Sequence, residues 1–497
     1  SEVSLKTIDF PIDTANFDEK GGLSAEEVEK IARTAGAGLT DGDVRVEALH
    51  YVDPQRFGDS ESLANGPLAG LEASSARSAP LPAHWWRLYD DPVLDDLVGQ
   101  AFAANTDLRV AAANLQRAAA VVDEAGAGRR PNVSVSAAPA YGRASGAAKG
   151  VPYALPGIGS YDAGAAVSYQ VDLFGKLSRG LEAANADADA AQAAYDLARV
   201  NVAAGTVRAY ADACAAGQQL DVARHSIALQ EQFADLTRKR AGMGRGTSLD
   251  ISRAQGQLEQ LRAAVPPLEA QRATALYRLA VLVGKVPGSM PASLATCHAP
   301  PTLRDPIPVG DGAALLRRRP DIRQAERSLA AATARIGVAT AELYPSISLG
   351  LSAGSTGTLS RFGADNSLRW SLGPLISWSL PNTGLARSHI EQAEAGSAAA
   401  LARFDAAVLN ALRETSSALT VYARDLDRTD ALRAARDRNR DAAEQARTLY
   451  RLGRTDFLTA LDADRTLAGS ESALTAAQGQ LAADQAALFL ALGGGWE

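Results

Sequence analysis

Few residues in this chain have the types and spacing that catalysis requires. Residues 350–354 read GLSAG and match the G-x-S-x-G turn that exposes a nucleophilic serine. That turn joins a strand directly to a helix, whereas more Ser, Gly and Thr follow here, so we interpret Ser352 as a chance match. The five histidines form no H-E-x-x-H or similar cluster. The sequence therefore predicts neither an enzyme nor a cofactor.

Two further patterns that could bind ligands have simpler explanations. Residues 242–246 alternate glycine with other residues like a phosphate loop, but they separate two helical patterns and follow no strand. Near the N-terminus, several residues fall at the offsets of a calcium loop, yet Lys20 occupies a ligand position. A capping box that starts at Ser24 and opens a short helix explains Glu27 instead.

The two cysteines, Cys214 and Cys297, lack the spacing of metal ligands. Cys214 lies seven residues after Val207, in a helical pattern, which predicts a small core residue. The sequence leaves open whether the two cysteines form a disulfide.

The elements that must position these residues are clearest between residues 307 and 351. Asp311 is a suitable N-cap, and the run after Pro320 carries apolar residues seven apart, from Ile322 to Leu343. Pro345 disfavours a helical conformation for the residue before it, so the helix should stop there. The apolar period then changes from seven to two, which predicts a strand.

The same series of patterns occurs twice along the chain. Gly244 and Gly453 are 209 residues apart, and so are Leu249 and Leu458. Each half reads helix, strand, strand, long helix, glycine turn and return helix, as a tandem duplication would. We expect an N-terminal extension and linker over 1–80, a first repeat over 81–300 and a second over 301–497. Residues 1–70 are expected to be dispensable, because they include too few apolar residues for a sizeable core.

The length of the helices and the number of strands limit the architecture. A helix of roughly 65 residues extends for about 100 Å at 1.5 Å per residue, as a tube or stalk would require. Two strands per half give four per chain, each roughly 10–14 residues long and sufficient to cross a bilayer when tilted. Four strands cannot close a barrel, and lipid does not tolerate open edges. Several copies should therefore share one barrel.

Charge and hydropathy exclude some classes of protein. The net charge is −7 with both signs interspersed, so there is no basic footprint for nucleic acid. No run of about 18 apolar residues predicts a spanning helix, which leaves transmembrane strands open. No signal peptide begins at Ser1, so we expect a mature sequence.

The motif LLRRRPDIRQAE followed by IGVATAELYPSISL resembles the outer-membrane efflux channel family, the TolC-like ducts, and in particular its nodulation-type drug-efflux branch. Further pieces, including HWWRLYDDPVLDDLV and YQVDLFGKL, extend the resemblance from about Trp85 to Leu492. It implies a mainly α chain with a transmembrane β part, which forms a trimer with a shared 12-stranded β-barrel and a helical barrel. The location implied is the bacterial outer membrane, with a long periplasmic extension. Relatives usually begin with a lipid-bearing cysteine, where this chain has Ser1.

The resemblance also implies a function and partners. The chain would be the passive exit duct of a tripartite efflux system for drugs or other small molecules. Its partners would be a periplasmic adaptor protein, an inner-membrane transporter of the RND type and outer-membrane lipid. A type I protein-secretion channel is the alternative within transport, and a soluble helical-hairpin scaffold is the alternative from another class. Trp370 and Trp378 on an apolar strand face argue against the soluble scaffold, because such a protein would have no reason to place tryptophans there.

The stretch YRLGRTDFLTALDADR resembles the periplasmic tip of that family, which narrows the pore and docks the adaptor. By position, the constriction would comprise Tyr450, Asp456, Leu458, Asp462, Leu249 and Asp250. The adaptor contacts would comprise Gly244, Arg245, Gly246, Thr247, Gly453, Arg454 and Thr455. A helix-capping role for Asp456 or Ser248 is the simpler alternative. A ring of carboxylates at one pore level would attract cations and suit a gate that a partner opens.

Alternation along the strands predicts which residues meet lipid. The expected lipid-facing residues are Ile347, Leu349, Leu351, Trp370, Leu372, Ile376 and Trp378. Serines of the opposite parity are expected to face water.

Overall fold

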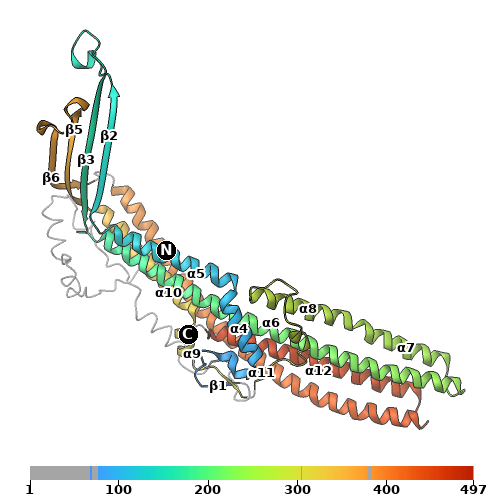
Figure 1. The fold of residues 1–497 in the computed structure, drawn as a ribbon. Helices are drawn as coiled ribbons and strands as arrows, with labels where there is room; N and C mark the ends of the chain where they lie inside the picture. Colours follow the sequence, from blue (N-terminus) through green and yellow to red (C-terminus); the bar gives the residue numbers. More distant parts are fainter. Residues whose placement is uncertain (1–67, 70–75, 304, 379–382, 496–497) are drawn as a thin grey trace. The chain divides into compact units, whose positions relative to one another are not determined.

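The computed structural model describes residues 68–69, 76–303, 305–378 and 383–495 (Figure 1). The helix expected near Ser24 and the calcium-like offsets lie outside these residues. The chain divides into two compact units. The sheet unit contains Gln116–Ala190 and Ala325–Phe404. The hairpin unit contains Ala191–Gln324, Asp405–Glu497 and the described residues of Pro54–Leu115.

The sheet unit is built on a four-stranded antiparallel sheet (Figure 1). Its strands, in spatial order, are β2 (Asn132–Gly142), β3 (Ile158–Val171), β5 (Ser346–Thr358) and β6 (Leu368–Ser377). They contain 11, 14, 13 and 10 residues, as the sequence predicted. β2 and β6 are the two edges, so each has one row of backbone groups without a neighbouring strand within the described chain.

The register of the sheet confirms the shared parity of the apolar residues. Leu351 lies opposite Leu372 on one side and Val167 on the other, and directly opposed residues point to the same face. The same face carries Ile347 and Ile376, which are also opposed. The other face carries the opposed serine pairs Ser346 with Ser377 and Ser352 with Ser371, and also Leu375, which lies opposite Ser348.

Ser352 lies in the middle of β5, and its Oγ is 2.8 Å from that of Ser371 in β6. A residue paired on both sides within a sheet does not occupy a strand-to-helix turn, so the structure shows no nucleophile elbow at the GLSAG motif.

The strands join the helices through short polar and aromatic contacts. Asp172, just after β3, accepts hydrogen bonds from the backbone of Leu177 at 2.9 Å and of Ser178 at 2.7 Å, and so caps the start of α6 (Lys176–Gly242). The rings of Phe174 and Tyr344 stack with centroids 4.7 Å apart. The chain directions of β3 and β5 are thereby fixed where they meet the helices.

Each half contains a helix break that the sequence analysis missed. Asp91 followed by Pro92 reads as an N-cap with proline in the first helical position, which predicts one helix that runs to about Gly126. The structure has two separate helices there, α4 (Pro92–Ala104) and α5 (Thr106–Ala127). Asn105 causes the break, because its side chain accepts from the backbone of Asp107 and donates to the carbonyl of Leu282 at 3.0 Å. A local side-chain bond of this kind competes with helical hydrogen bonding.

The second half repeats this break at Pro320. The helix that Asp311 caps, α9 (Gly312–Arg318), ends before α10 (Pro320–Thr340) begins. Proline disfavours a helical conformation at Arg319 and is well tolerated as the first residue of α10. The expected stop before Pro345 is confirmed, since β5 begins at Ser346.

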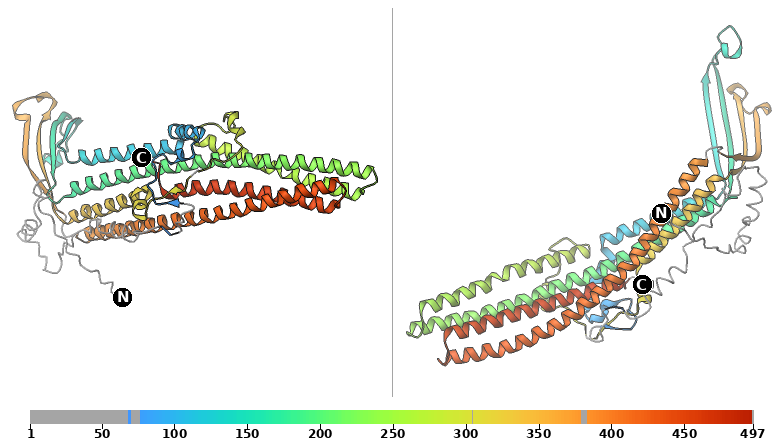
Figure 2. Two further views of the ribbon diagram at one scale, coloured as in Figure 1. Left: turned by 90° about the horizontal axis from the view of Figure 1, so that it is seen from below. Right: turned by 180° about the vertical axis from the view of Figure 1, so that it is seen from behind.

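The hairpin unit contains two long helical hairpins (Figure 2). One joins the end of α6 to α7 (Ser248–Ala263) and α8 (Val265–Leu282), and the other joins the end of α11 (Thr383–Arg451) to α12 (Phe457–Leu492). The pair Pro266-Pro267 predicts a kink in the return helix, and the structure has a break between α7 and α8 there, with Pro266 in the first turn of α8. None of the helices in the described ranges has the length and apolar character needed to span a bilayer.

The core of the hairpin unit gathers residues from both halves of the sequence. Trp85, which is fully buried, stacks on Phe489 with centroids 4.2 Å apart and donates to the carbonyl of Gly494 at 3.2 Å. A short parallel pair, β1 (Ala76–Arg77) with β4 (Ile307–Pro308), lies in the same unit. The conspicuous HWWRLY motif is thus a packing element.

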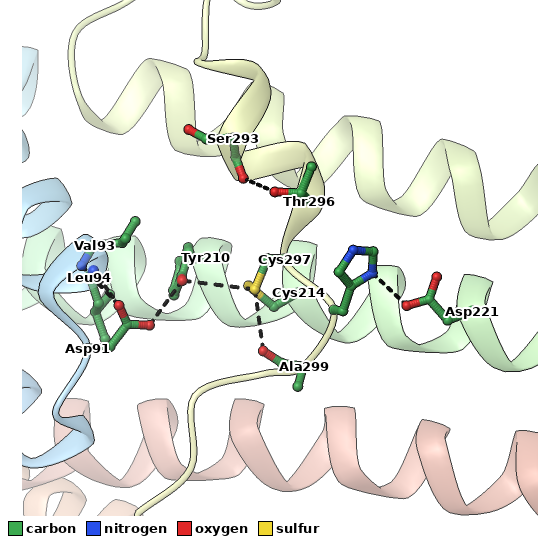
Figure 3. Close-up of a disulfide and its surroundings, with 11 residues drawn as sticks. Asp91, Val93, Leu94, Tyr210, Cys214, Asp221, Ser293, Thr296, Cys297 and Ala299 are labelled. Atoms are coloured by element: carbon green, nitrogen blue, oxygen red, sulfur yellow. Dashed lines mark hydrogen bonds and ion pairs between the residues drawn. A yellow bond between two sulfur atoms is a disulfide. The ribbon is translucent and has the colours of Figure 1, made fainter.

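Cys214 and Cys297 form a disulfide, which answers the question that the sequence left open (Figure 3). Cys214 lies on α6 and Cys297 follows α8, so the bond fixes the segment between the halves onto the long helix. A Cβ on Gly217 would lie 2.1 Å from the carbonyl oxygen of Cys297, so only glycine permits this approach. His298 and Asp221, 2.5 Å apart, extend the contact along α6.

Candidate functional site

The two glycine turns at the hairpin ends have the same backbone geometry. Gly244 and Gly453 both have φ of 73°, which glycine adopts without steric cost. Arg245 donates to the carbonyl of Arg240, and Arg454 donates to that of Leu449, at 2.9 and 2.8 Å. The backbone of Gly244 donates to the carbonyl of Ala241, and that of Gly453 to the carbonyl of Tyr450, which completes Schellman closures of α6 and α11.

The residues after the turns cap the returning helices. Thr247 and Asp250 form a reciprocal capping box at α7, with bonds of 2.9 and 3.2 Å. Asp456 caps α12 by accepting from the backbone of Thr459, and its bonds to Thr459 lower its pKa. The capping alternative for Asp456 is confirmed, whereas in the first hairpin the cap is Thr247 and not Ser248.

The other constriction candidates have exposed side chains in the single chain. Leu249 is 55% exposed, Leu458 is 51% exposed, and Asp462 is exposed as well. The predicted adaptor residues are exposed except Thr455, which is half-buried. They comprise Gly244, Arg245, Gly246, Thr247, Gly453, Arg454 and Thr455. Their contact with an adaptor stays a prediction.

Tyr450 lies in an apolar cluster that joins the two hairpins, which we call the tip cluster. Its residues are Phe233, Ala234, Ala254, Tyr450, Phe457 and Ala460. The ring of Phe233 is 5.4 Å from that of Tyr450 and 5.6 Å from that of Phe457. Only 4% of Tyr450 is exposed, so within one chain it is a packing residue. That it lines a passage stays a prediction.

Arg240 ties the first hairpin to the turn of the second. Its guanidinium lies 4.3 Å from the ring centroid of Tyr450 and donates a hydrogen bond to the carbonyl oxygen of the same residue. Sequence reasoning missed Arg240 and Phe233, because their partners are more than 200 residues away and spacing gives no signal for such contacts.

Ion pairs with buried carboxylates lie further along the same hairpins. Arg447 on α11 contacts Asp464 on α12 at 2.5 Å, and Arg440 contacts Glu471 at 3.2 Å. Burial raises the pKa of Asp464 while Arg447 opposes that rise. The second carboxylate oxygen of Asp464 is buried and has no hydrogen-bond partner among the described residues. Loss of Arg447 would therefore leave a buried charge unpaired.

A polar groove of about 530 Å³ runs beside these pairs, between α6 on one side and α11 and α12 on the other. The lining residues that can bear charge include His225, Arg436, Arg440, Glu444, Arg447 and Glu471. The groove is therefore lined by charges of both signs.

The predicted lipid-facing residues are exposed or half-buried in the single chain. Trp370 is the extreme case at 78% exposed. Trp378 lies just past β6, and its indole donates to the carbonyl of Leu343 at 3.2 Å. An apolar face of this extent on an isolated sheet needs a covering medium or partner.

Within the described ranges, no group of three or more His, Cys, Asp or Glu residues could hold a metal ion. The site therefore consists of turns, exposed leucines, charges and an apolar strand face.

Comparison with known proteins gives consistent matches. The family described as outer membrane efflux protein matches residues 97–285 and 313–494. Nodulation protein T of Rhizobium leguminosarum bv. viciae is 30% identical over 83% of this chain and 84% of its own length. The cation efflux system protein CusC of Escherichia coli O6:H1 is 28% identical over 84% and 89%. The solved structure of the outer-membrane channel OprN is 36% identical, covers 87% of this chain and 97% of its own, and has a TM-score of 0.81.

Proposed function

Because the chain belongs to the outer membrane efflux protein family, we propose that three copies form one exit duct closed at the ends of their helical hairpins. The chain is an outer-membrane channel of an efflux system, with a long periplasmic helical extension. The relatives are efflux proteins, so nothing supports protein secretion or a soluble scaffold.

The observation that carries the trimer is the four-stranded sheet with two open edges and one exposed apolar face. Lipid does not tolerate unpaired strand edges, so β2 and β6 must pair with strands of other copies. Three copies would supply twelve strands, and each repeat, 81–300 or 301–497, would supply two of the four in one chain. The apolar face would then meet lipid and the serine face would meet water.

The gate would lie at the hairpin ends. Leu249 and Leu458 expose apolar side chains just beyond the two turns, and a ring of such residues resists wetting. Asp462 would add charge one helical turn further along α12. Tyr450 and Arg240 would support these residues by holding the two hairpins together.

The exposed turns suit contact with a periplasmic adaptor. Their backbone geometry is fixed by glycine and by the caps, so an adaptor would meet a preformed surface. Energy for transport would come from an inner-membrane transporter of the RND type. Relatives are named for toluene and for cation efflux, so the cargo class proposed here is small molecules in general.

Single-channel recording in planar bilayers tests the gate. Substitution of Leu458 and Asp462 together by alanine should raise the conductance of the closed channel, because neither residue caps a helix or packs in the tip cluster. A matched control is Leu452→Ala, since Leu452 is exposed but lies on the turn itself. Unchanged conductance in an intact oligomer would place the constriction elsewhere.

A further inference from the structure

Arg253 in α7 is the structural counterpart of Asp462 in α12. Each lies six residues after the N-cap of its helix, which is Thr247 in one case and Asp456 in the other. The 209-residue offset that relates the turns and the caps also relates these two positions. The duplication therefore has a guanidinium in one hairpin where it has a carboxylate in the other.

Both charges lie on helix faces that the chain leaves open. Arg253 and Asp462 are exposed, and each follows an exposed leucine, Leu249 or Leu458, by four residues. Residues four apart share a helix face. With 3.6 residues per turn, this face points away from the residues that α7 and α12 contribute to the tip cluster. Because the buried faces of α7 and α12 meet within the chain, the open faces are available to other copies.

Neither charge has a partner among the described residues. No hydrogen bond or ion pair there involves Arg253 or Asp462, although other charges of the same helices are paired. Arg262 of α7 contacts Glu231 at 2.7 Å, and Asp464 of α12 contacts Arg447. An unpaired guanidinium and an unpaired carboxylate at equivalent levels are complementary in charge, and this is the pair that forms the strongest charge-assisted hydrogen bonds.

We propose that Arg253 of one copy pairs with Asp462 of the next copy, so that the closed constriction is a neutral ring of alternating charges beside the leucines. This inference rests on the proposed trimeric duct. In such a ring the hairpin of α7 and the hairpin of α12 alternate around one axis, so three arginines alternate with three aspartates.

The pairing changes the expected selectivity of the passage. A ring of Asp462 alone would attract cations and repel anions. Arg253 at the same level cancels that charge, so the closed channel should discriminate only weakly between K⁺ and Cl⁻. Arg253 is thus a residue that determines ion selectivity, and it also holds neighbouring copies together.

Reversal potentials in a KCl gradient test the neutral ring. Wild type should reverse near zero, Arg253→Gln should shift toward the K⁺ potential, and Asp462→Asn should shift toward the Cl⁻ potential. The double variant should return close to wild type. The control Arg238→Gln removes an exposed arginine that pairs with Asp235 within α6, and it should leave selectivity unchanged. A cation-selective wild type that Arg253→Gln does not alter would overturn the proposal.

Cross-linking tests the pairing between copies. With Arg253→Cys and Asp462→Cys in one chain, mild oxidation should give covalent oligomers that reductant dissolves, while each single variant should give none. The native cysteines are joined to each other and do not compete. An intact, conducting trimer without cross-links would refute the pairing alone. A wild-type chain that remains monomeric would refute the proposed duct and this inference together.

Discussion

The carboxyl group of Asp484 lies buried on α12 and accepts a hydrogen bond from Gln480 at 2.8 Å. Burial and the neighbouring Asp425 raise its pKa to about 6. Since the folded-state pKa is above the ordinary value, the folded chain binds a proton that the unfolded chain has lost between about pH 4 and 6. The stability that this proton confers is present at low pH and is lost as pH rises through 6.

The first prediction follows from the raised pKa of Asp484. Asp484→Asn should raise the thermal midpoint at pH 7.5, because it removes a buried charge next to Asp425, and should give no gain at pH 4.5. Circular dichroism melts at the two pH values measure this. The control is Asp441→Asn, an exposed aspartate on α11. Equal gains at both pH values would show that the charge of Asp484 is not the cause.

Arg319 carries the second residue-scale prediction. Its nearly buried guanidinium donates to the carbonyl of Ala491 at 2.9 Å and contacts Asp321 and Glu414 at 2.6 and 2.9 Å. These bonds to the acids raise its pKa although burial lowers it. Arg319→Met should lower the free energy of unfolding by about 3–5 kcal/mol, because it leaves Asp321, Glu414 and the carbonyl of Ala491 without their charged partner.

Denaturant titration in detergent measures that cost, with Arg403→Met at an exposed position as the control. The control should change stability by less than about 0.5 kcal/mol. If both variants unfold at the same midpoint as wild type, the contacts of Arg319 contribute nothing to stability.

At the scale of elements, the disulfide joins α6 to the segment that connects the two halves, across a separation of 83 residues. Loops of this length lose considerable entropy when they close, so the bond should contribute about 2–4 kcal/mol. Cys214→Ala with Cys297→Ser should lower the melting midpoint and expose residues 285–311 to protease. Reductant should reproduce the loss in wild type and leave the variant unchanged. A variant that is still sensitive to reductant would point to another cause.

The elements that sequence predicts well here are those with local causes. The strand parity of Leu351 and Leu372, the caps at Asp311 and Asp91, and the turns at Gly244 and Gly453 follow from period and turn chemistry. The break at Asn105 was missed because a single side-chain bond to Leu282 competes with an otherwise good helical pattern.

The tip cluster could not be predicted for a different reason. Phe233, Tyr450 and Phe457 meet only after both hairpins have formed, and no spacing in the sequence encodes a contact between them. The same holds for the pair of Arg447 and Asp464, whose burial depends on how α11 packs on α12. Site residues with local roles, such as Asp456, were recognisable as caps.

At the scale of the whole molecule, the sheet has a face for lipid and a face for water. Leu372→Arg should cost about 2–4 kcal/mol in refolding into bilayers, against little for Ser371→Arg on the opposite face. The two residues are neighbours in β6, so strand position is matched. Refolding titrations measure both. Equal tolerance would contradict the assignment of the apolar face to lipid.

The central claim is that the strands of one chain close only with those of other copies. Native mass measurement of the refolded protein in detergent tests it most directly, because β2 and β6 each present an open edge in the single chain. The account predicts one dominant folded species with the mass of three chains. A folded monomer that is stable and carries the full helix and strand content would contradict it.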